Sequence, residues 1–87
     1  MRKIEWTTAF KRDFKKIGTF ESNFIEALWK LANDESLPEN FCDHSLTGEW
    51  KDFRDCHIQP DLILIYRKQN IDCLQLVRLG SHSKLGL

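Results

Sequence analysis

The first part of the chain changes from a strand pattern to a helix pattern. Residues 3–7 alternate polar and apolar, which predicts a short, half-buried strand. Apolar residues then recur at i, i+4 and i+7, the spacing of one helix face. These residues are Phe10, Phe14 and Ile17. Thr7 and Thr8 offer hydroxyls that can cap this helix at its start, and Gly18 can end it.

A second helical stripe follows, and Thr19 can cap its first turn. The residues of this stripe are Phe24, Leu28, Leu31 and Ala32. Ile25 and Trp29 widen it, and we expect Trp29 in the core. The helix should end near Asn33-Asp34, before Leu37-Pro38, because the residue before a proline disfavours helical geometry.

Strand patterns dominate the second half of the chain. Residues 33–50 are expected to form a long acidic loop, and Lys51 to His57 a strand. The run at 62–66 is continuously apolar, which predicts a central strand covered on both faces. A turn at Lys68-Gln69-Asn70 leads to a last strand from Ile71 to Leu79. In that strand one face should hold Leu74, Leu76 and Arg78, and the other Cys73, Gln75, Val77 and Leu79.

The resulting order is β-α-α-β-β-β. It predicts one α+β domain over residues 1–87, in which two N-terminal helices pack on one face of a small, mainly antiparallel sheet. Hydrophobic residues make up 41 % of the chain and charged residues 30 %, an ordinary balance for a folded domain. There is no apolar run long enough to cross a bilayer and no signal peptide, so we expect no membrane association and a cytoplasmic location. The three cysteines are widely spaced, and reduced thiols are expected.

The net charge is zero, but its distribution is uneven. Residues 1–30 carry a net charge of +3, residues 31–50 of −5, and residues 51–87 of +2. A protein that binds nucleic acid mainly through charge would be strongly basic overall. Contact with RNA would therefore depend on a local basic face, such as the predicted helix that carries Lys11, Arg12, Lys15 and Lys16. A solvated helix face is the more common role for such a cluster.

The three histidines of the chain all lie outside the apolar stripes. His44 lies in the acidic loop, His57 before a turn and His82 after the last strand, while Asp61 lies across the turn from His57. A three-residue loop, 58–60, would place His57 and Asp61 on the same face, whereas a two-residue loop, 59–60, would place them on opposite faces. We favour the three-residue loop because it brings both residues into one site.

Imidazole groups give and take protons near neutral pH, as RNA strand cleavage requires. A base removes the 2′-hydroxyl proton, the oxygen attacks phosphorus, and an acid protonates the leaving 5′-oxygen. Arg54, Arg67 or Arg78 could stabilise the charge on the phosphoryl oxygens, and Trp50 or Phe53 could stack on bases or anchor the core. This chemistry needs no metal. The same side chains could bind Zn²⁺, although their spacing matches no compact zinc signature.

Two segments of the chain resemble a known family. Residues 43–66 resemble the pattern DHxLxGxWxxxRDxHxxPDxxLIY of YafQ-type toxins in the RelE/ParE superfamily, and residues 77–83 resemble their closing RxGTHS segment. Two positions depart from the family pattern. Leu62 stands where a Trp is common after the motif Asp, and the tail 84–87 lacks the usual Phe, which is thought to stack on the mRNA base.

The resemblance implies a RelE-like, microbial-RNase-like fold and ribosome-dependent cleavage of mRNA in the A site, without a cofactor. It implies inhibition by a DinJ-like ribbon-helix-helix antitoxin, with which the toxin would bind operator DNA. The family's catalytic positions fall on His44, His57, Asp61 and His82. His82 is the first choice for proton transfer, and Asp61 for orienting or base work. The candidate RNA-binding and phosphate-binding residues are Trp50, Lys51, Arg54 and Arg78. The two arginines could instead only pair with Asp52, Asp55 or Asp72.

Two alternatives belong to other functional classes. One is a RelE/ParE-fold toxin that binds a protein target without cleaving RNA, although ParE-like proteins lack this set of histidines. The other is a zinc-dependent hydrolase, which would contain stoichiometric metal.

Overall fold

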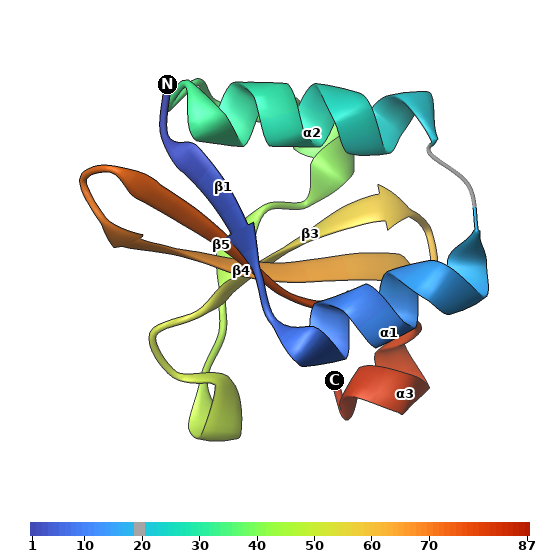
Figure 1. The fold of residues 1–87 in the computed structure, drawn as a ribbon. Coiled ribbons are helices and arrows are strands. Elements are labelled where there is room, and N and C mark those ends of the chain that lie inside the picture. Colours follow the sequence, from blue (N-terminus) through green and yellow to red (C-terminus); the bar gives the residue numbers. More distant parts are fainter. Residues whose placement is uncertain (19–20) are drawn as a thin grey trace.

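A five-stranded sheet forms the centre of the protein, with the strands in the order β1-β5-β4-β3-β2 (Figure 1). β1 runs parallel to β5, and the other neighbouring strands are antiparallel. The computed structural model describes residues 1–18 and 21–87. Its elements are β1 (Lys3–Trp6), α1 (Thr8–Ile17), α2 (Ser22–Ala32), η1 (Glu39–Phe41), β2 (His44–Ser45), η2 (Gly48–Trp50), β3 (Arg54–Gln59), β4 (Leu62–Asn70), β5 (Cys73–Gly80) and α3 (His82–Leu85). The expected α+β fold with a mainly antiparallel sheet is confirmed.

The first helix, α1, begins and ends where the sequence predicts. The Thr7 hydroxyl accepts a hydrogen bond from the Phe10 N–H at 3.0 Å, which satisfies one of the free donors of the first turn. The same hydroxyl donates to the Val77 carbonyl at 2.7 Å, so this cap also attaches the start of α1 to β5. Gly18 ends the helix with a positive φ of 76°, a conformation that glycine adopts without steric cost.

The second helix, α2, begins at Ser22 with Glu21 at the N-cap position, and Glu21 makes no side-chain capping hydrogen bond. Thr19, the predicted cap, lies outside the described residues. The predicted end of the helix is confirmed, since Asn33 occupies the C-cap position. The expectation that Trp29 is buried was wrong, because 60 % of its surface is exposed.

The neighbour of Trp29 on the outer side of α2, Ile25, is likewise 55 % exposed. The side of α2 that faces the sheet is already filled by Phe24, Ala27 and Leu31, which are buried. Both residues of the wider stripe therefore remain on the solvent side of the helix. An apolar stripe shows that one face is buried, but its width does not set how far burial extends around the helix.

The sheet separates two apolar clusters. On the helix side, Leu64 and Tyr66 of β4 pack with residues of α1 and α2. On the opposite side, Ile63 and Ile65 pack with Leu85 of α3 and with the segment around η2. Figure 1 shows α2 above the sheet, and α3 and the yellow-green segment that contains η2 below it. All four β4 residues are at most 1 % exposed, which confirms the predicted central strand covered on both faces.

The strand boundaries differ from the predicted ones at three places. The expected acidic loop at 33–50 contains β2, a two-residue strand that adds a fifth member to the sheet. The strand predicted from Lys51 begins only at Arg54. β4 continues through the predicted turn at 68–70, and the chain reverses at Ile71-Asp72 instead. Pairing with a neighbouring strand, which local sequence does not specify, sets each of these limits.

A β-bulge in β5 changes the predicted division of its faces. Ile65 pairs with Arg78 but Tyr66 pairs with Leu76, so Val77 is the extra residue. Leu79 therefore packs on the helix side with Leu76, and Val77 packs on the opposite side. No helix among the described residues is long and apolar enough to cross a membrane.

Candidate active site

The first candidate residue, His44, lies on β2 and is paired with Asp55 of β3. Its Nδ1 atom is 2.7 Å from the carbonyl oxygen of Cys42. A carbonyl oxygen can only accept a hydrogen bond, so Nδ1 carries the proton and donates it. In the neutral ring the Nε2 atom is then the basic nitrogen. The short strand β2, which the sequence pattern did not reveal, is what positions this imidazole.

His57 projects from β3 on the side of the sheet away from α1 and α2. Its neighbours Cys56 and Ile58 are buried in the cluster on the helix side. Successive side chains of a strand point to opposite faces, so Asp55 and His57 share the other face. The alternation within this strand thus places a carboxylate and an imidazole on one side.

His82 begins α3, directly after Ser81, whose hydroxyl accepts a hydrogen bond from the Lys84 N–H and caps the helix. Asp61 lies across from it in the turn between β3 and β4. One carboxylate oxygen of Asp61 is 3.0 Å from the backbone nitrogen of His82 and 2.7 Å from its Nδ1 atom. The hydrogen bond from the backbone N–H of His82 is the largest cause that lowers the pKa of Asp61, and the hydrogen bond from the ring of His82 is the next. The carboxylate holds the imidazole in one orientation and leaves Nε2 for proton transfer.

The three imidazoles lie around one cavity. The ring centroids of His57 and His82 are 5.2 Å apart, in an edge-to-face arrangement. The cavity has a volume of about 520 Å³ and is lined by His44, Leu46, Thr47, Gly48, Glu49, Trp50, Asp55, His57, His82, Gly86 and Leu87. Segments that are far apart in the sequence therefore supply one site, and Asp61 joins it through His82.

Asp55 is a member of this site that the sequence suggested only as an ion-pair partner for arginine. It is 3 % exposed, and its Oδ1 atom has no hydrogen-bond partner among the described residues. That oxygen is 3.1 Å from Nδ1 of His44, but the N–H of His44 points to Cys42 instead. Burial raises the pKa of Asp55, against the opposing effect of the imidazoles of His44, His57 and His82. The two-residue spacing of Asp55 and His57 on one strand was the signal that could have revealed it.

The hairpin that carries His57 and Asp61 differs from both predicted loops. His57 pairs with Ile63 and Gln59 pairs with Leu62, so Ile58 is a bulged residue and the loop consists of Pro60 and Asp61. Asp61 is therefore a turn residue and not the cross-strand partner of His57. It reaches the site by bonding His82, a contact that no property of the hairpin itself determines.

The four predicted RNA-binding residues are in different situations. Trp50 lines the cavity, and its ring nitrogen donates to the Leu85 carbonyl at 3.3 Å. Lys51 is exposed beside it. Arg54 Nε is 3.4 Å from Asp43, which also accepts a hydrogen bond from the Tyr66 hydroxyl.

Arg78 is bound by a carboxylate outside the site. Its Nε and Nη2 atoms donate to the two oxygens of Asp13 on α1, at 2.7 and 3.2 Å. Neither Arg78 nor Arg54 has the predicted partners Asp52, Asp55 or Asp72. Their role in phosphate binding stays a prediction.

The geometry also bears on metal binding. Within residues 1–18 and 21–87, no group of three or more His, Cys, Asp and Glu side chains is placed to hold a metal ion. The arrangement suits proton transfer, since it offers imidazole nitrogens around a hollow and carboxylates behind two of the rings.

Comparison with known families matches almost the whole chain. The family model described as the bacterial toxin of type II toxin–antitoxin system, YafQ, matches residues 2–86. The mRNA interferase toxin YafQ of Escherichia coli strain K12 is 35 % identical to this chain, over 97 % of this chain and 95 % of that protein.

Two solved structures are similar over the whole fold. A copper-bound mutant toxin from Helicobacter pylori has a TM-score of 0.91 and 43 % identity, over 98 % of this chain and 99 % of that one. The toxin in the Escherichia coli DinJ–YafQ complex has a TM-score of 0.81 and 32 % identity, over 98 % of both chains.

Proposed function

The chain belongs to the YafQ family of bacterial toxins of type II toxin–antitoxin systems, and on this premise we propose that it is an endoribonuclease. It cleaves mRNA in the A site of translating ribosomes in the cytoplasm and so stops translation. The Escherichia coli relative is named as an mRNA interferase, which supports this activity. The observation that carries the proposal is the group of three imidazoles around one cavity, with Asp61 hydrogen-bonded to His82.

We assign the general base to His44. Its Nδ1 proton is donated to the Cys42 carbonyl, so Nε2 has a free lone pair when the ring is neutral. That nitrogen removes the proton of a ribose 2′-hydroxyl, and the resulting oxygen attacks the adjacent phosphorus. The bond from phosphorus to the 5′-oxygen breaks, which leaves a 2′,3′-cyclic phosphate and a strand that begins with a 5′-hydroxyl.

The general acid is His82. The carboxylate of Asp61, 2.7 Å from Nδ1, stabilises the imidazolium form, and Nε2 gives its proton to the departing 5′-oxygen. His57 lies beside this ring, and we assign it a contact with a phosphoryl oxygen. Asp55 lies behind His44, with its Oδ1 atom 3.1 Å from Nδ1 of that ring, and contributes a negative charge to the site.

RNA contacts come from the rim of the cavity. Apart from the histidines, Trp50 is the aromatic residue among those that line the cavity. We therefore assign it the face on which a base stacks. It takes over the role of the Phe common in the family, because Gly86 and Leu87 line this cavity without an aromatic ring. Lys51 and Arg54 are exposed and contact phosphates, and Arg78 does so only if its guanidinium leaves Asp13.

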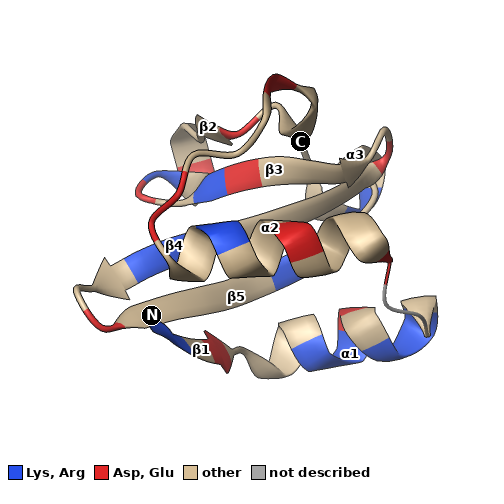
Figure 2. Ribbon diagram, turned by 90° about the horizontal axis from the view of Figure 1, so that it is seen from above, with Lys and Arg blue, Asp and Glu red and all other residues tan. Residues whose placement is uncertain are grey.

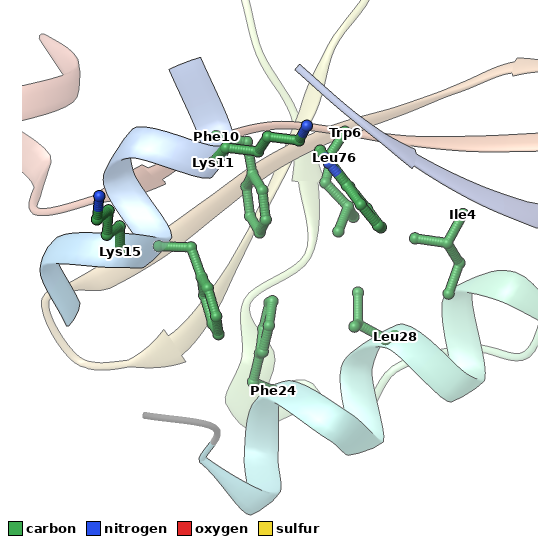
Figure 3. A pocket seen from close by; sticks show the side chains of 9 residues that line it. Ile4, Trp6, Phe10, Lys11, Lys15, Phe24, Leu28 and Leu76 are labelled. Carbon is green, nitrogen blue, oxygen red and sulfur yellow. The ribbon is translucent and has the colours of Figure 1, made fainter. Parts of the chain in front are cut away.

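We further propose a DinJ-like ribbon-helix-helix antitoxin as the partner, through which the complex binds operator DNA. A second hollow, of about 550 Å³, lies between α1 and α2 and has almost entirely apolar walls. Figure 3 shows Trp6 and Phe10 facing it on one side, and Phe24 and Leu28 of α2 on the other. Its lining residues include no acid–base pair, so we assign it to antitoxin binding and not to the reaction.

The charge of the residues around this groove indicates the chemistry of the antitoxin segment that binds there. Lys11 and Lys15 line the groove, and Lys11 lies over the Trp6 ring, 5.8 Å from its centroid. Figure 2 shows the blue of Lys and Arg concentrated along α1. A segment with apolar side chains flanked by acidic ones therefore fits this surface.

The activity is tested by expressing the chain and its His82→Ala variant, and by mapping cuts on a translated reporter mRNA by primer extension. We expect cuts within translated codons for the wild type, and a rate about 10²- to 10⁴-fold lower for the variant, the usual contribution of a general acid or base. Ser83→Ala, a change at the next exposed position of α3, is the matched control and should cut at the wild-type rate. Equal cleavage by the wild type and His82→Ala would contradict the assignment.

The same experiment separates the alternatives. Growth arrest by both proteins without mRNA cuts would indicate a toxin that binds a protein target. Cuts of equal strength on naked RNA would argue against dependence on the ribosome. Cleavage that is lost with a chelator and restored by zinc would indicate a metal-dependent hydrolase.

The docking surface is tested by measuring antitoxin affinity. Trp6→Ala should weaken binding roughly tenfold or more, as expected for an exposed aromatic residue at the centre of an interface, and should leave cleavage unchanged. Ile71→Ala removes an exposed apolar side chain at the β4–β5 turn and is the control. Equal affinities of the two variants would place the antitoxin elsewhere.

A further inference from the structure

The strand that leads to His82 extends beyond its partner strand. β1 pairs with β5 only as far as Trp6 and Leu76, after which the Thr7 N–H bonds the Leu76 carbonyl and the chain turns into α1. From Val77 onward, this edge of β5 faces α1 instead of a strand. Backbone donors on a buried edge need other acceptors, because an unsatisfied buried N–H is costly.

Asp13 of α1 supplies that acceptor. Its Oδ2 atom is 3.0 Å from the Leu79 N–H and 2.7 Å from Arg78 Nε, and its Oδ1 atom is 3.2 Å from Arg78 Nη2. The carboxylate is 5 % exposed, and the ammonium of Lys84 on α3 is 4.0 Å away. One buried side chain thus binds the end of β5 and faces the helix that follows it.

These contacts lie immediately before the proposed general acid. Arg78 and Leu79 are four and three residues before His82. The connection between them is short, since only Gly80 and Ser81 stand between Leu79 and His82. A displacement at Leu79 would therefore move the start of α3, and with it the His82 ring that bonds Asp61.

We propose that Asp13 is a positioning residue for His82: by holding Arg78 and the Leu79 N–H, it fixes the end of β5 so that the His82 ring meets Asp61 and the cavity. The inference rests on the proposed function, because it assigns His82 to the reaction. Asp13 itself is not among the residues that line the cavity. A shift of about 1 Å in a catalytic group can lower a rate by roughly 10²-fold, so this support has a measurable effect.

The experiment is a double-mutant cycle on cleavage by ribosomes that translate a reporter mRNA. The single-turnover rate and the half-saturating toxin concentration are measured for the wild type, D13N, D13A, H82A and the double variants D13N/H82A and D13A/H82A. D13N keeps the shape of the side chain and an oxygen for the Leu79 N–H but loses the charge that Arg78 pairs with. D13A loses all three hydrogen bonds.

We expect D13A to lower the maximal rate roughly 10- to 100-fold with little change in the half-saturating concentration, and D13N to lie between D13A and the wild type. In the H82A background, both changes should alter the residual rate less than about twofold, because the group they position is absent. D34N is the control, since Asp34 also pairs with two cations, Arg2 and Lys68, but at the opposite end of β4.

Three results would overturn the proposal. Wild-type rates in folded D13A and D13N would show that His82 needs no support from α1. An equal loss with and without His82 would indicate a general loss of structure. A raised half-saturating concentration that persists in H82A would indicate that Asp13 acts on RNA binding through Arg78. If D13A is unfolded at the assay temperature, as judged by circular dichroism, the D13N cycle decides.

The proposed function can fail separately from this inference. Its failure is an inactive wild type, or an H82A variant as active as the wild type. The positioning role fails when the wild type cuts, H82A does not, and Asp13 makes no difference.

Discussion

Two regions of this small domain each bury an aspartate to nearly the same extent, but they differ in the hydrogen bonds that they provide to its carboxylate. At the junction of α1 and β5, Asp13 is 5 % exposed and both of its oxygens accept hydrogen bonds. On the opposite face of the sheet, Asp55 is 3 % exposed and one of its oxygens has no partner among the described residues. Burial alone therefore does not distinguish them, but pairing does.

The pKa values of the two carboxyl groups record this difference. Burial acts to raise the pKa of Asp13, but the hydrogen bonds from Arg78 and Leu79, with the charges of Arg78 and Lys84, outweigh it and lower the pKa. At Asp55 burial prevails over the neighbouring imidazoles and the pKa is raised. A satisfied buried carboxylate contributes to structure, whereas an unsatisfied one near titratable groups marks a site of chemistry.

The largest effect on stability should come from breaking the satisfied pair. D13N removes the charge opposite Arg78 and should lower the free energy of unfolding by about 2 to 3 kcal/mol, less than for a fully buried pair because Arg78 is partly exposed. Urea unfolding at pH 7 measures this change. D34N removes an exposed pair and should leave the urea midpoint nearly unchanged. Equal losses in D13N and D34N would show that the burial of Asp13 has no energetic consequence.

A smaller effect, of opposite sign, is expected at the unsatisfied carboxylate. D55N removes a charge that is buried without a full set of partners, so it should raise the free energy of unfolding at pH 7 by about 1 kcal/mol. The same change should lower mRNA cleavage roughly tenfold, because the imidazoles lose a nearby negative charge. Urea unfolding and the primer-extension rate measure the two quantities. A variant that is both less stable and inactive would assign Asp55 a purely structural role.

The smallest expected effect is on the pH dependence of the free energy of unfolding, to which the two aspartates contribute over different pH ranges. The lowered pKa of Asp13 means that its stabilisation is complete above the unfolded value, about 3.9, and is lost as the pH falls below it. The raised pKa of Asp55 means that its cost is present at neutral pH and disappears as the pH falls towards about 3.9. Urea unfolding of the wild type, D13N and D55N is measured between pH 3 and 7. As the pH falls, the difference in free energy of unfolding between D55N and the wild type should disappear above about pH 3.9, and the difference between D13N and the wild type below it. If both stability differences disappeared over the same pH range, the opposite pKa shifts of Asp13 and Asp55 would be contradicted.

The sequence was sufficient for the parts of the fold that depend on local pattern. The spacing of Phe10, Phe14 and Ile17, with Thr7 and Gly18 at its ends, predicted α1 correctly. The apolar run at 62–66 predicted the central strand. In the helix, the periodicity specifies which face is buried. In the strand, the continuous apolar run specifies that both faces are buried.

The candidate site was predicted in part. The motif identified His44, His57, Asp61 and His82, and the structure brings the three imidazoles to one cavity with Asp61 bonded to His82. The hairpin argument for that arrangement was wrong, because Asp61 is in the turn. Asp55 was considered only as an arginine partner. Its two-residue spacing from His57 indicates that the two share a face, but its burial and its position opposite His44 depend on the pairing of β3 with β2.

The sequence by itself determined the order of α1, α2 and the four longer strands, the buried faces of α1 and β4, and the residue types that carry the chemistry. Only the tertiary structure decided the pairing of β2 with β3, the bulges at Ile58 and Val77, the exposure of Trp29 and the attachment of Arg78 to Asp13. The physical reason is the separation along the chain of the residues that determine each feature. A helix or strand pattern reflects neighbours along the chain, whereas the partner of a buried charge or a strand edge depends on segments that only folding brings together.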